Sequence, residues 1–304
     1  MKPPFNPVNQ LQWEASHVPD FMNPCDVENS RVSLVIPIYN AGGFLEKALR
    51  SIQLSDLRNV QIIVADGGSD DNTHQILEYY SEVISDVISE PDRGQSDAIN
   101  KGFAKATGQI FCWLNGDDLF LPHALNHVRN FYIANNNPDF IVGNAFMTER
   151  NLKPINHFVF SDDMLKVSHL IDYATNHLVQ PSVFFSRQAW QECGPLDIHD
   201  HYAMDADLFI AIASKFKGLH LDIDLACSVY HDECKTRKRR AESITQLAIV
   251  QAKYGGFAEA RKTLDILVSM YNQLSQDRSS AMQKNFTDFQ KELYDLVMTA
   301  RMAG

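Results

Sequence analysis

The sequence predicts an α/β fold in which a mostly parallel sheet is flanked by helices and followed by a C-terminal helical extension. Strand-like and helical patterns alternate between residues 31 and 135, which is typical of parallel sheets. The 304 residues are 45% hydrophobic, enough to bury one large core. Only helical patterns follow residue 240. We therefore expect an irregular N-terminal arm at 1–30, one α/β domain at 31–240 and a helical extension at 241–304.

The alternation is clearest in the first half of the domain. Runs rich in β-branched residues predict buried strands, which we place at 31–40, 60–65, 83–92 and 109–118. Apolar residues at helical spacing predict the intervening helices, which we place at 44–54, 73–81, 95–107 and 121–135. Pro122 is expected in the first turn of the last of these helices, where its missing N–H costs nothing.

The pattern changes after residue 135. Strands are expected at 139–148 and 154–160, followed by a loop-rich stretch to residue 180. Residues 201–216 read as a strongly amphipathic helix, and residues 218–231 as a strand pair or one long strand. A basic run, KTRKRR, then separates this domain from the helical extension.

Composition excludes several classes of protein. A formal net charge of -11 argues against a chain built to coat nucleic acid. Five cysteines without a C-x-x-C pair indicate free thiols in a reducing compartment. The N-terminus lacks the pattern of a secretory signal, and no run approaches the roughly 18 apolar residues of a membrane span. We expect a cytoplasmic protein, with peripheral contact at the inner face of the membrane left open.

Polar residues gather where the predicted parallel strands end. Pro37 and Tyr39 follow the first strand, Asp66 follows the second, and Asp117 and Asp118 follow the strand at 109–118. Ligands of open α/β sheets bind beyond the carboxyl ends of the strands. Adjacent carboxylates repel, but they can hold Mg²⁺ together with substrate phosphates. The ordinary alternatives are an Asx turn that caps the next helix and, at Asp66, turn chemistry.

Three further clusters are candidates for chemistry. Arg93 and Asp97 lie between a strand and a helix, where Arg93 could face a diphosphate or simply form surface pairs. Asp205 lies at the start of an apolar helix, where the helix dipole favours an ionised carboxylate. It could act as a catalytic base or simply cap the helix. His231 could ligate a metal and Lys235 could neutralise phosphates, although a basic run is usually a solvated face.

The order and spacing of these segments resemble glycosyltransferase family 2, the inverting nucleotide-sugar transferases. The resemblance covers residues 32–236 and is carried by five segments: VSLVIPIYN, VADGGSDDNT, ISEPDRGQSDAINKGFAKATGQIFCWLNGDD, YAMDADLF and YHDECKT. The long third segment resembles the bacterial branch that builds surface polysaccharides. The resemblance implies a GT-A fold, with a Rossmann-like sheet and a divalent cation, Mg²⁺ or Mn²⁺.

The resemblance also implies roles at matching positions. Asp205 would be the general base. Asp118 would hold the metal, with His231 beside it. The remaining residues would bind the nucleotide sugar: Pro37, Tyr39, Asp66, Arg93, Asp97, Asp117 and Lys235. Many members carry a second aspartate where this chain has Gly67, so the contacts to the nucleobase are left open.

The expected activity is transfer of a sugar from a nucleotide-diphosphate donor, with a UDP-sugar favoured, to a hydroxyl of a glycan or lipid-linked acceptor in polysaccharide biosynthesis. Two alternatives remain. A sugar nucleotidyltransferase would need a basic, Gly-rich loop, and PIYNAGGFLEK offers only Lys47. A non-catalytic nucleotide-sugar-binding protein would have no need of both Asp118 and Asp205.

The C-terminal extension lies beyond the resemblance and is interpreted from its pattern alone. Residues 257–274 and 288–300 each place apolar side chains on one helical face, which must be buried. We favour packing on the chain's own domain or on a second subunit in a homo-oligomer. Acidic residues on the polar faces, such as Asp265 and Glu292, argue against a membrane surface.

Overall fold

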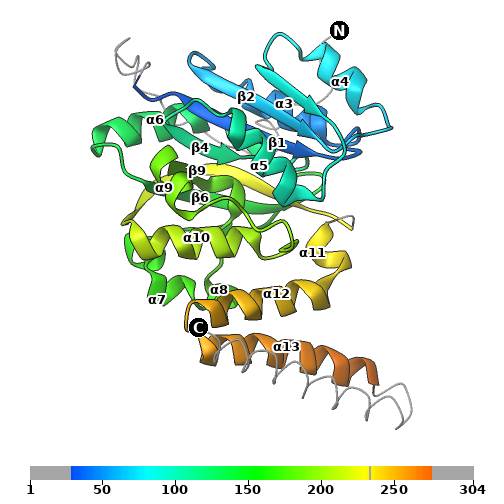
Figure 1. The fold of residues 1–304 in the computed structure, drawn as a ribbon, viewed down its shortest axis with the longest axis vertical. Coiled ribbons are helices and arrows are strands. Elements are labelled where there is room, and N and C mark those ends of the chain that lie inside the picture. The colour runs from blue at the N-terminus through cyan, green and yellow to red at the C-terminus, as the bar shows by residue number, and fades with distance from the viewer. Residues whose placement is uncertain (1–28, 233, 276–304) are drawn as a thin grey trace.

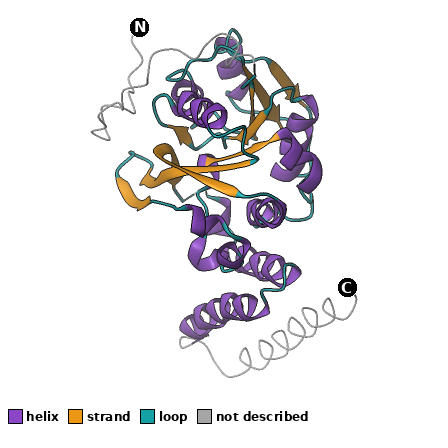
Figure 2. Cartoon of the chain, turned by 90° about the vertical axis from the view of Figure 1, so that its left-hand side faces the viewer, coloured by secondary structure: helices purple, strands orange, loops and turns teal. Residues whose placement is uncertain are grey.

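The computed structural model describes residues 29–232 and 234–275. Within these residues, strands join into one nine-stranded sheet of order β3-β2-β1-β4-β8-β6-β9-β5, and β7 pairs with β6. Helices cover both faces of the sheet, and the last helices lie below the α/β body (Figures 1 and 2). The N-terminal arm predicted for 1–30 lies almost entirely outside the described residues, as does the predicted helix at 288–300.

The first half of the sheet is parallel, as predicted. β1 (Val32–Ile38) pairs in parallel with β2 (Val60–Asp66) and β4 (Ile110–Trp113), and β2 pairs in parallel with β3 (Asp86–Ser89). The intervening helices are α3 (Leu45–Ile52), α4 (Thr73–Tyr79), α5 (Gln95–Lys105) and α6 (Ala124–Ala134). The position predicted for Pro122 is wrong by two residues. His123 adopts a left-handed conformation with φ 63° and α6 starts after it, so Pro122 precedes the helix.

The second half of the sheet is mixed. The predicted strands appear as β6 (Phe140–Glu149), β7 (Pro154–Phe158) and one long strand, β9 (Gly218–Tyr230). β6 and β9 are parallel, whereas β8 (Val183–Ser186) runs antiparallel to both β4 and β6. The two-residue strand β5 (Leu119–Phe120) pairs with β9 and was not predicted. This pairing brings the segment after β4 beside the end of β9.

Short helices occupy much of the stretch predicted as loop-rich. They are η1 (Asp162–Leu165), α7 (Val167–Leu170), α8 (Tyr173–Asn176) and η2 (Gln180–Ser182), followed after β8 by α9 (Arg187–Cys193). Turns of three or four residues carry too little periodicity for detection from sequence. They cover one face of the sheet together with α10 (Met204–Lys215), the amphipathic helix predicted at 201–216.

The core lies on both faces of the sheet, because successive side chains of a strand point to opposite sides. Val35 of β1 packs with Phe103, Trp113 and Phe209 on the face covered by α5 and α10. Leu34 packs on the other face, beneath α3 and α6. Burying a large apolar side chain contributes about 1.5–3 kcal/mol. The two layers fix the ends of the central strands, where the site lies.

The tail begins as a helical pair attached to the domain. α11 (Lys235–Lys238) leads into α12 (Arg240–Lys253), and Gly255, with φ 83°, turns the chain into α13 (Phe257–Ser275). Val250 of α12 joins the core beneath α10, and α13 packs on α12 (Figure 1). The helix predicted at 257–274 is α13, which packs on α12, and a second subunit stays a prediction. Among the described helices, none has the length and hydropathy needed to cross a bilayer.

Candidate active site

A cavity of about 590 Å³ opens at the carboxyl ends of β1 and β4. Its walls come from the loop after β1, the start of α5, the segment after β4, the entry to α10 and the end of β9. Seven of the predicted site residues line it: Pro37, Tyr39, Asp117, Asp118, Asp205, His231 and Lys235. The strand-end prediction therefore located the cavity.

Asp117 faces His231 across the cavity wall. The Asp117 Oδ2 lies 2.9 Å from His231 Nε2, and the imidazole stacks on Phe44 with ring centroids 4.5 Å apart. Cys234 is close by: ligand atoms of Asp117, His231 and Cys234 all lie within 4.8 Å of one another. A carboxylate oxygen, an imidazole nitrogen and a thiol form a donor set that suits a divalent cation.

Asp118 has a different environment from its neighbour. It is only 4% exposed, and its Oδ1 accepts a hydrogen bond from the Val229 N–H of β9 at 3.0 Å. Its Oδ2 accepts from the Asn115 side chain at 3.0 Å. Burial, with a smaller effect of the adjacent Asp117 charge, raises the pKa of Asp118 well above the usual range of a carboxyl. Asp118 is thus tied to the sheet.

The metal role of Asp118 beside His231 stays a prediction, and the hydrogen bonds around the two carboxylates make Asp117 a second candidate for that role. Both oxygens of Asp118 accept hydrogen bonds from the protein, whereas Asp117 reaches His231 directly. The side chains of Asp117 and Asp118 point in different directions. Asp118 lies against β9 and Asp117 lies against His231, which the sequence does not reveal. Cys234 was missed, although its position three residues after His231 is a spacing compatible with two ligands on one turn.

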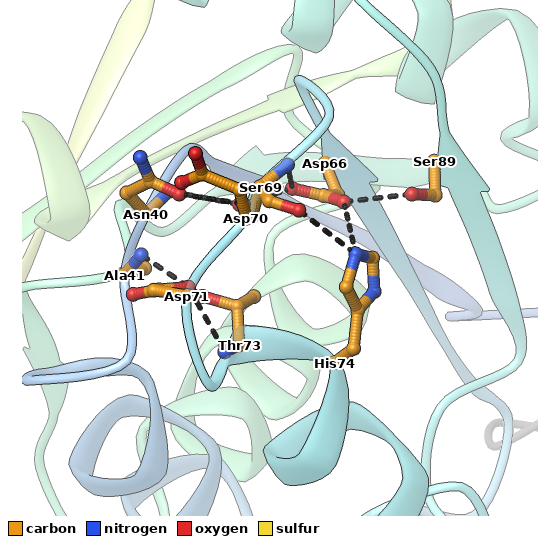
Figure 3. A network of polar contacts seen from close by, with 9 residues as sticks. All are labelled: Asn40, Ala41, Asp66, Ser69, Asp70, Asp71, Thr73, His74 and Ser89. Atoms are coloured by element: carbon orange, nitrogen blue, oxygen red, sulfur yellow. Dashed lines mark hydrogen bonds and ion pairs between the residues drawn. The ribbon is translucent and has the colours of Figure 1, made fainter.

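Asp66 is not among the residues that line the cavity. Figure 3 shows it among its hydrogen-bond partners. Its carboxylate is buried and accepts hydrogen bonds from the hydroxyl groups of Ser69 and Ser89. Ser69 Oγ in turn accepts from the Asn40 N–H at 2.8 Å, next to Tyr39 in the cavity wall. The predicted contact of Asp66 with the nucleotide stays a prediction. The position of Asp66 indicates that it shapes the loop that carries Tyr39.

Asp92 occupies the space that Gly67 leaves open. A Cβ placed on Gly67 would lie 2.5 Å from Asp92 Oδ2, so an aspartate at position 67 and Asp92 could not both hold these positions. The other Asp92 oxygen accepts from the Gly94 N–H at 2.8 Å, and Asp92 lines the cavity. Sequence reasoning did not select Asp92, although the run Glu-Pro-Asp directly before Arg93 and Gly94 was a signal.

Arg93 and Asp97 lie outside this cavity. The Arg93 guanidinium lies 3.2 Å from Asp97 Oδ1, and both residues line a second hollow of about 560 Å³. Their predicted contact with the nucleotide sugar stays a prediction. Arg93 precedes Gly94, the N-cap of α5, and Asp97 lies in the first turn of this helix, so the two form the ion pair weighed as the alternative, with Arg93 exposed and Asp97 buried.

Asp205 and Asp207, two residues apart in the first turn of α10, point to different places. Asp205 lines the first cavity, where burial raises its pKa to about 6. Asp207 lines the second hollow, where its carboxylate lies 2.7 and 2.8 Å from the Lys253 ammonium. Successive residues of a helix are about 100° apart around its axis, which separates the two carboxylates. Of the two, only Asp205 is available to a ligand in the first cavity.

Aromatic, cationic and amide side chains complete the cavity. Tyr39 is 65% exposed at its edge, and the Lys235 ammonium lies 5.2 Å from the centre of the Tyr202 ring. Asn115 accepts from the Gln95 side chain at 2.6 Å and donates to Gln180 at 3.3 Å. These amides were not predicted, because their partners come from segments far apart in the sequence.

Comparison with known proteins places this arrangement in a family. A family model described as glycosyl transferase family 2 matches residues 33–194, more than half of the chain. An uncharacterised glycosyltransferase of Rickettsia typhi is 29% identical over 245 residues, which is 74% of this chain and 71% of the relative. One from Nostoc is 32% identical over 101 residues, 32% of this chain and 31% of the relative.

Two solved structures show the same fold. TarS of S. aureus (residues 1–349), in complex with UDP-GlcNAc, has a TM-score of 0.56 at 15% identity, covering 74% of this chain and 66% of that one. The mannosyltransferase PcManGT of Pyrobaculum calidifontis, in complex with GDP-Man and Mn²⁺, has a TM-score of 0.55 at 17% identity, covering 96% and 88%. At these identities the likeness concerns the fold alone, and the predicted α/β GT-A fold is confirmed.

Proposed function

The chain belongs to glycosyl transferase family 2, and from this premise we propose that it is an inverting, metal-dependent enzyme that uses a nucleotide-diphosphate sugar. The observation that carries the proposal is one cavity with two kinds of chemistry. Asp117, His231 and Cys234 offer ligands for a cation, and Asp205 offers a carboxylate of raised pKa. A UDP-sugar is the favoured donor, and a hydroxyl of a glycan or lipid-linked molecule in polysaccharide biosynthesis is the proposed acceptor.

The nucleobase is proposed to bind between Tyr39 and Asp92. An exposed aromatic ring offers a stacking surface, and Pro37 adds an apolar wall. A carboxylate accepts hydrogen bonds, so Asp92 would favour a base that presents an N–H, as uracil does. TarS was crystallised with UDP-GlcNAc and PcManGT with GDP-Man, which makes a UDP-sugar and a GDP-sugar the two donors to compare.

The diphosphate is proposed to lie near Asp117, His231 and Lys235. A divalent cation bound by Asp117, His231 and Cys234 would neutralise charge that develops on the diphosphate leaving group. The proposed cation is Mg²⁺ or Mn²⁺, because both ions take carboxylate oxygens and water as ligands. Lys235 adds positive charge from the protein, and Asp118 holds the segment after β4 against β9.

Asp205 is proposed to be the general base. The acceptor hydroxyl gives its proton to the Asp205 carboxylate while its oxygen attacks the anomeric carbon. The bond from that carbon to the diphosphate oxygen breaks, and the electron pair leaves with the nucleotide. A single displacement from the opposite face inverts the anomeric centre. A base with a pKa of about 6 is ionised at neutral pH and still accepts a proton readily.

Nucleotide release tests the proposal. The purified chain is incubated with UDP-, GDP- and dTDP-sugars, with and without Mn²⁺, and wild type is compared with Asp205→Asn and with Asp163→Asn. Asp163 is an exposed residue paired with Lys166, so its variant is a matched control. Mn²⁺-dependent release that only Asp205→Asn abolishes supports the proposal. Nucleotide-sugar binding without any release would favour the non-catalytic alternative, and pyrophosphate release from UTP with a sugar phosphate would favour the nucleotidyltransferase.

A further inference from the structure

Helix α12 contacts the segment that carries Asp205. Both lie beyond residues 33–194, which the family model matches. In Figure 1, α12 runs directly beneath α10. The segment at 199–207 enters α10 and supplies His201, Tyr202 and Asp205 to the cavity wall. No side chain of this segment caps the first turn of α10 from the N-cap position, Ala203.

Gln246 of α12 binds three backbone groups of this segment. Its Oε1 accepts from the N–H groups of His201 at 3.0 Å and Tyr202 at 2.8 Å. Its Nε2 donates to the carbonyl oxygen of His199 at 3.2 Å. One half-buried amide thus holds both sides of the turn. The Tyr202 N–H also donates to Asp200 Oδ1, at 3.1 Å, so loss of Gln246 would leave the His201 N–H without this acceptor, which is costly where water is excluded.

A second contact holds the same helix start from the other side. The Lys253 ammonium and the Tyr254 hydroxyl, at the end of α12, both bind the Asp207 carboxylate, at 2.7 and 2.9 Å. Between these two contacts, Val250 packs into the core beneath α10. The segment from His199 to Asp207 is therefore held at both ends by one helix.

We propose that Gln246 is a positioning residue of the active site, and that α12 is part of the catalytic unit. The inference rests on the proposed function of Asp205. Gln246 fixes the backbone of His201 and Tyr202, whose side chains line the cavity, and the Tyr202 ring carries the ammonium of Lys235. Without the Gln246 amide, the backbone of His201 and Tyr202 next to Asp205 becomes more mobile. The expected consequence is poorer alignment of the substrates with only a small effect on the rest of the fold.

The experiment compares three variants of the full chain. Gln246→Ala removes the amide, and Gln246→Glu keeps an oxygen that can accept from both N–H groups. Gln251→Ala is the matched control, because Gln251 is a buried glutamine of the same helix that donates to Ile171 instead, at 2.9 Å. Hydrogen–deuterium exchange of peptides covering 199–205 is measured together with kcat, KM and the melting temperature.

We expect Gln246→Ala to speed exchange at 199–205 about tenfold or more and to lower kcat/KM by roughly tenfold to a hundredfold. Gln246→Glu should restore part of both losses, because it keeps the acceptor for the two N–H groups but loses the donor to the His199 carbonyl oxygen. Gln251→Ala should lower the melting temperature and leave kcat/KM near that of wild type. Unchanged exchange in Gln246→Ala, no rescue by Gln246→Glu, or an equal loss of activity in Gln251→Ala would each overturn the inference. Exchange needs no turnover, so a wild-type chain without transfer activity would refute the proposed function and leave this test intact.

Discussion

Replacement of Asp205 by Asn should have two opposite effects, a loss of turnover and a gain in stability at neutral pH. Asp205 is proposed to accept a proton from the acceptor, and an amide cannot. The amide nevertheless keeps the size of the side chain and can still accept from the Ala206 N–H, as Asp205 does at 2.8 Å. Loss of general-base catalysis lowers kcat by about 10² to 10⁴.

The gain in stability follows from the direction of the pKa shift. Burial raises the pKa of Asp205 from 3.8 to about 6, an effect that the Ala206 N–H opposes and the Asp200 charge reinforces. Between these pH values the native state binds more protons than the unfolded chain, so the stability contributed by this group is lost as pH rises. At 1.36 kcal/mol for each pKa unit, the ionised carboxylate costs the native state at most about 3 kcal/mol above pH 7.

Two measurements check this reasoning. Chemical denaturation of wild type and Asp205→Asn at pH 4 and pH 7.5 should show nearly equal stability at the lower pH, and a more stable Asn variant at the higher one. The kcat/KM of wild type should rise with pH through about 6, where the carboxylate ionises. A flat pH profile between 5 and 8, together with no gain in stability for the Asn variant at pH 7.5, would refute the assignment of Asp205 as a buried base.

Three other predictions concern the metal site, the nucleobase site and the C-terminal helices. Asp117→Asn should abolish Mn²⁺-dependent nucleotide binding in calorimetry, whereas Asp118→Asn should retain that binding, because the Asp118 carboxylate bonds the sheet. Equal Mn²⁺ binding by Asp117→Asn would return the metal role to Asp118. Asp92→Ala should raise the KM for the donor about tenfold with little change in melting temperature, and unchanged KM would remove Asp92 from the nucleobase site. Deletion after residue 240 should expose the core surface that Val250 covers and cause aggregation in size-exclusion chromatography, with or without lipid. A truncated chain that stays monomeric and equally heat-stable, but no longer binds anionic vesicles, would favour a membrane role for the tail.

Several features of this protein were accessible from sequence because they are local. Runs of β-branched residues predict strands such as β1 and β2, and apolar periodicity predicts α10. Parallel strands place their carboxyl ends at one edge of the sheet, so Pro37, Tyr39 and Asp117 could be placed together from the sequence, whereas Asp205 was placed with them by the family resemblance. The order of the sequence segments predicted glycosyltransferase family 2, and the match of the family model confirms it.

Other features were decided only by the tertiary structure. Asp117 and Asp118 are equivalent in sequence, and the difference arises because β9 supplies a backbone donor to one and His231 faces the other. Asp66 was predicted to bind nucleotide, yet serines from its own turn and from β3 enclose it. The hydrogen-bond partners of these aspartates lie many residues away or depend on the direction of a side chain in a turn. A local sequence pattern predicts neither.

The helical tail shows the same division. Its periodicity predicted helices with a buried face, and α12 does bury Val250 against the domain. Nothing in that pattern distinguished Gln246 from Gln251, two glutamines five positions apart on one helix. One binds the turn that enters α10, and the other binds a carbonyl next to α7, far from the cavity wall. The amphipathic pattern determines that a helix packs, whereas the path of the chain opposite each side chain determines what that side chain does.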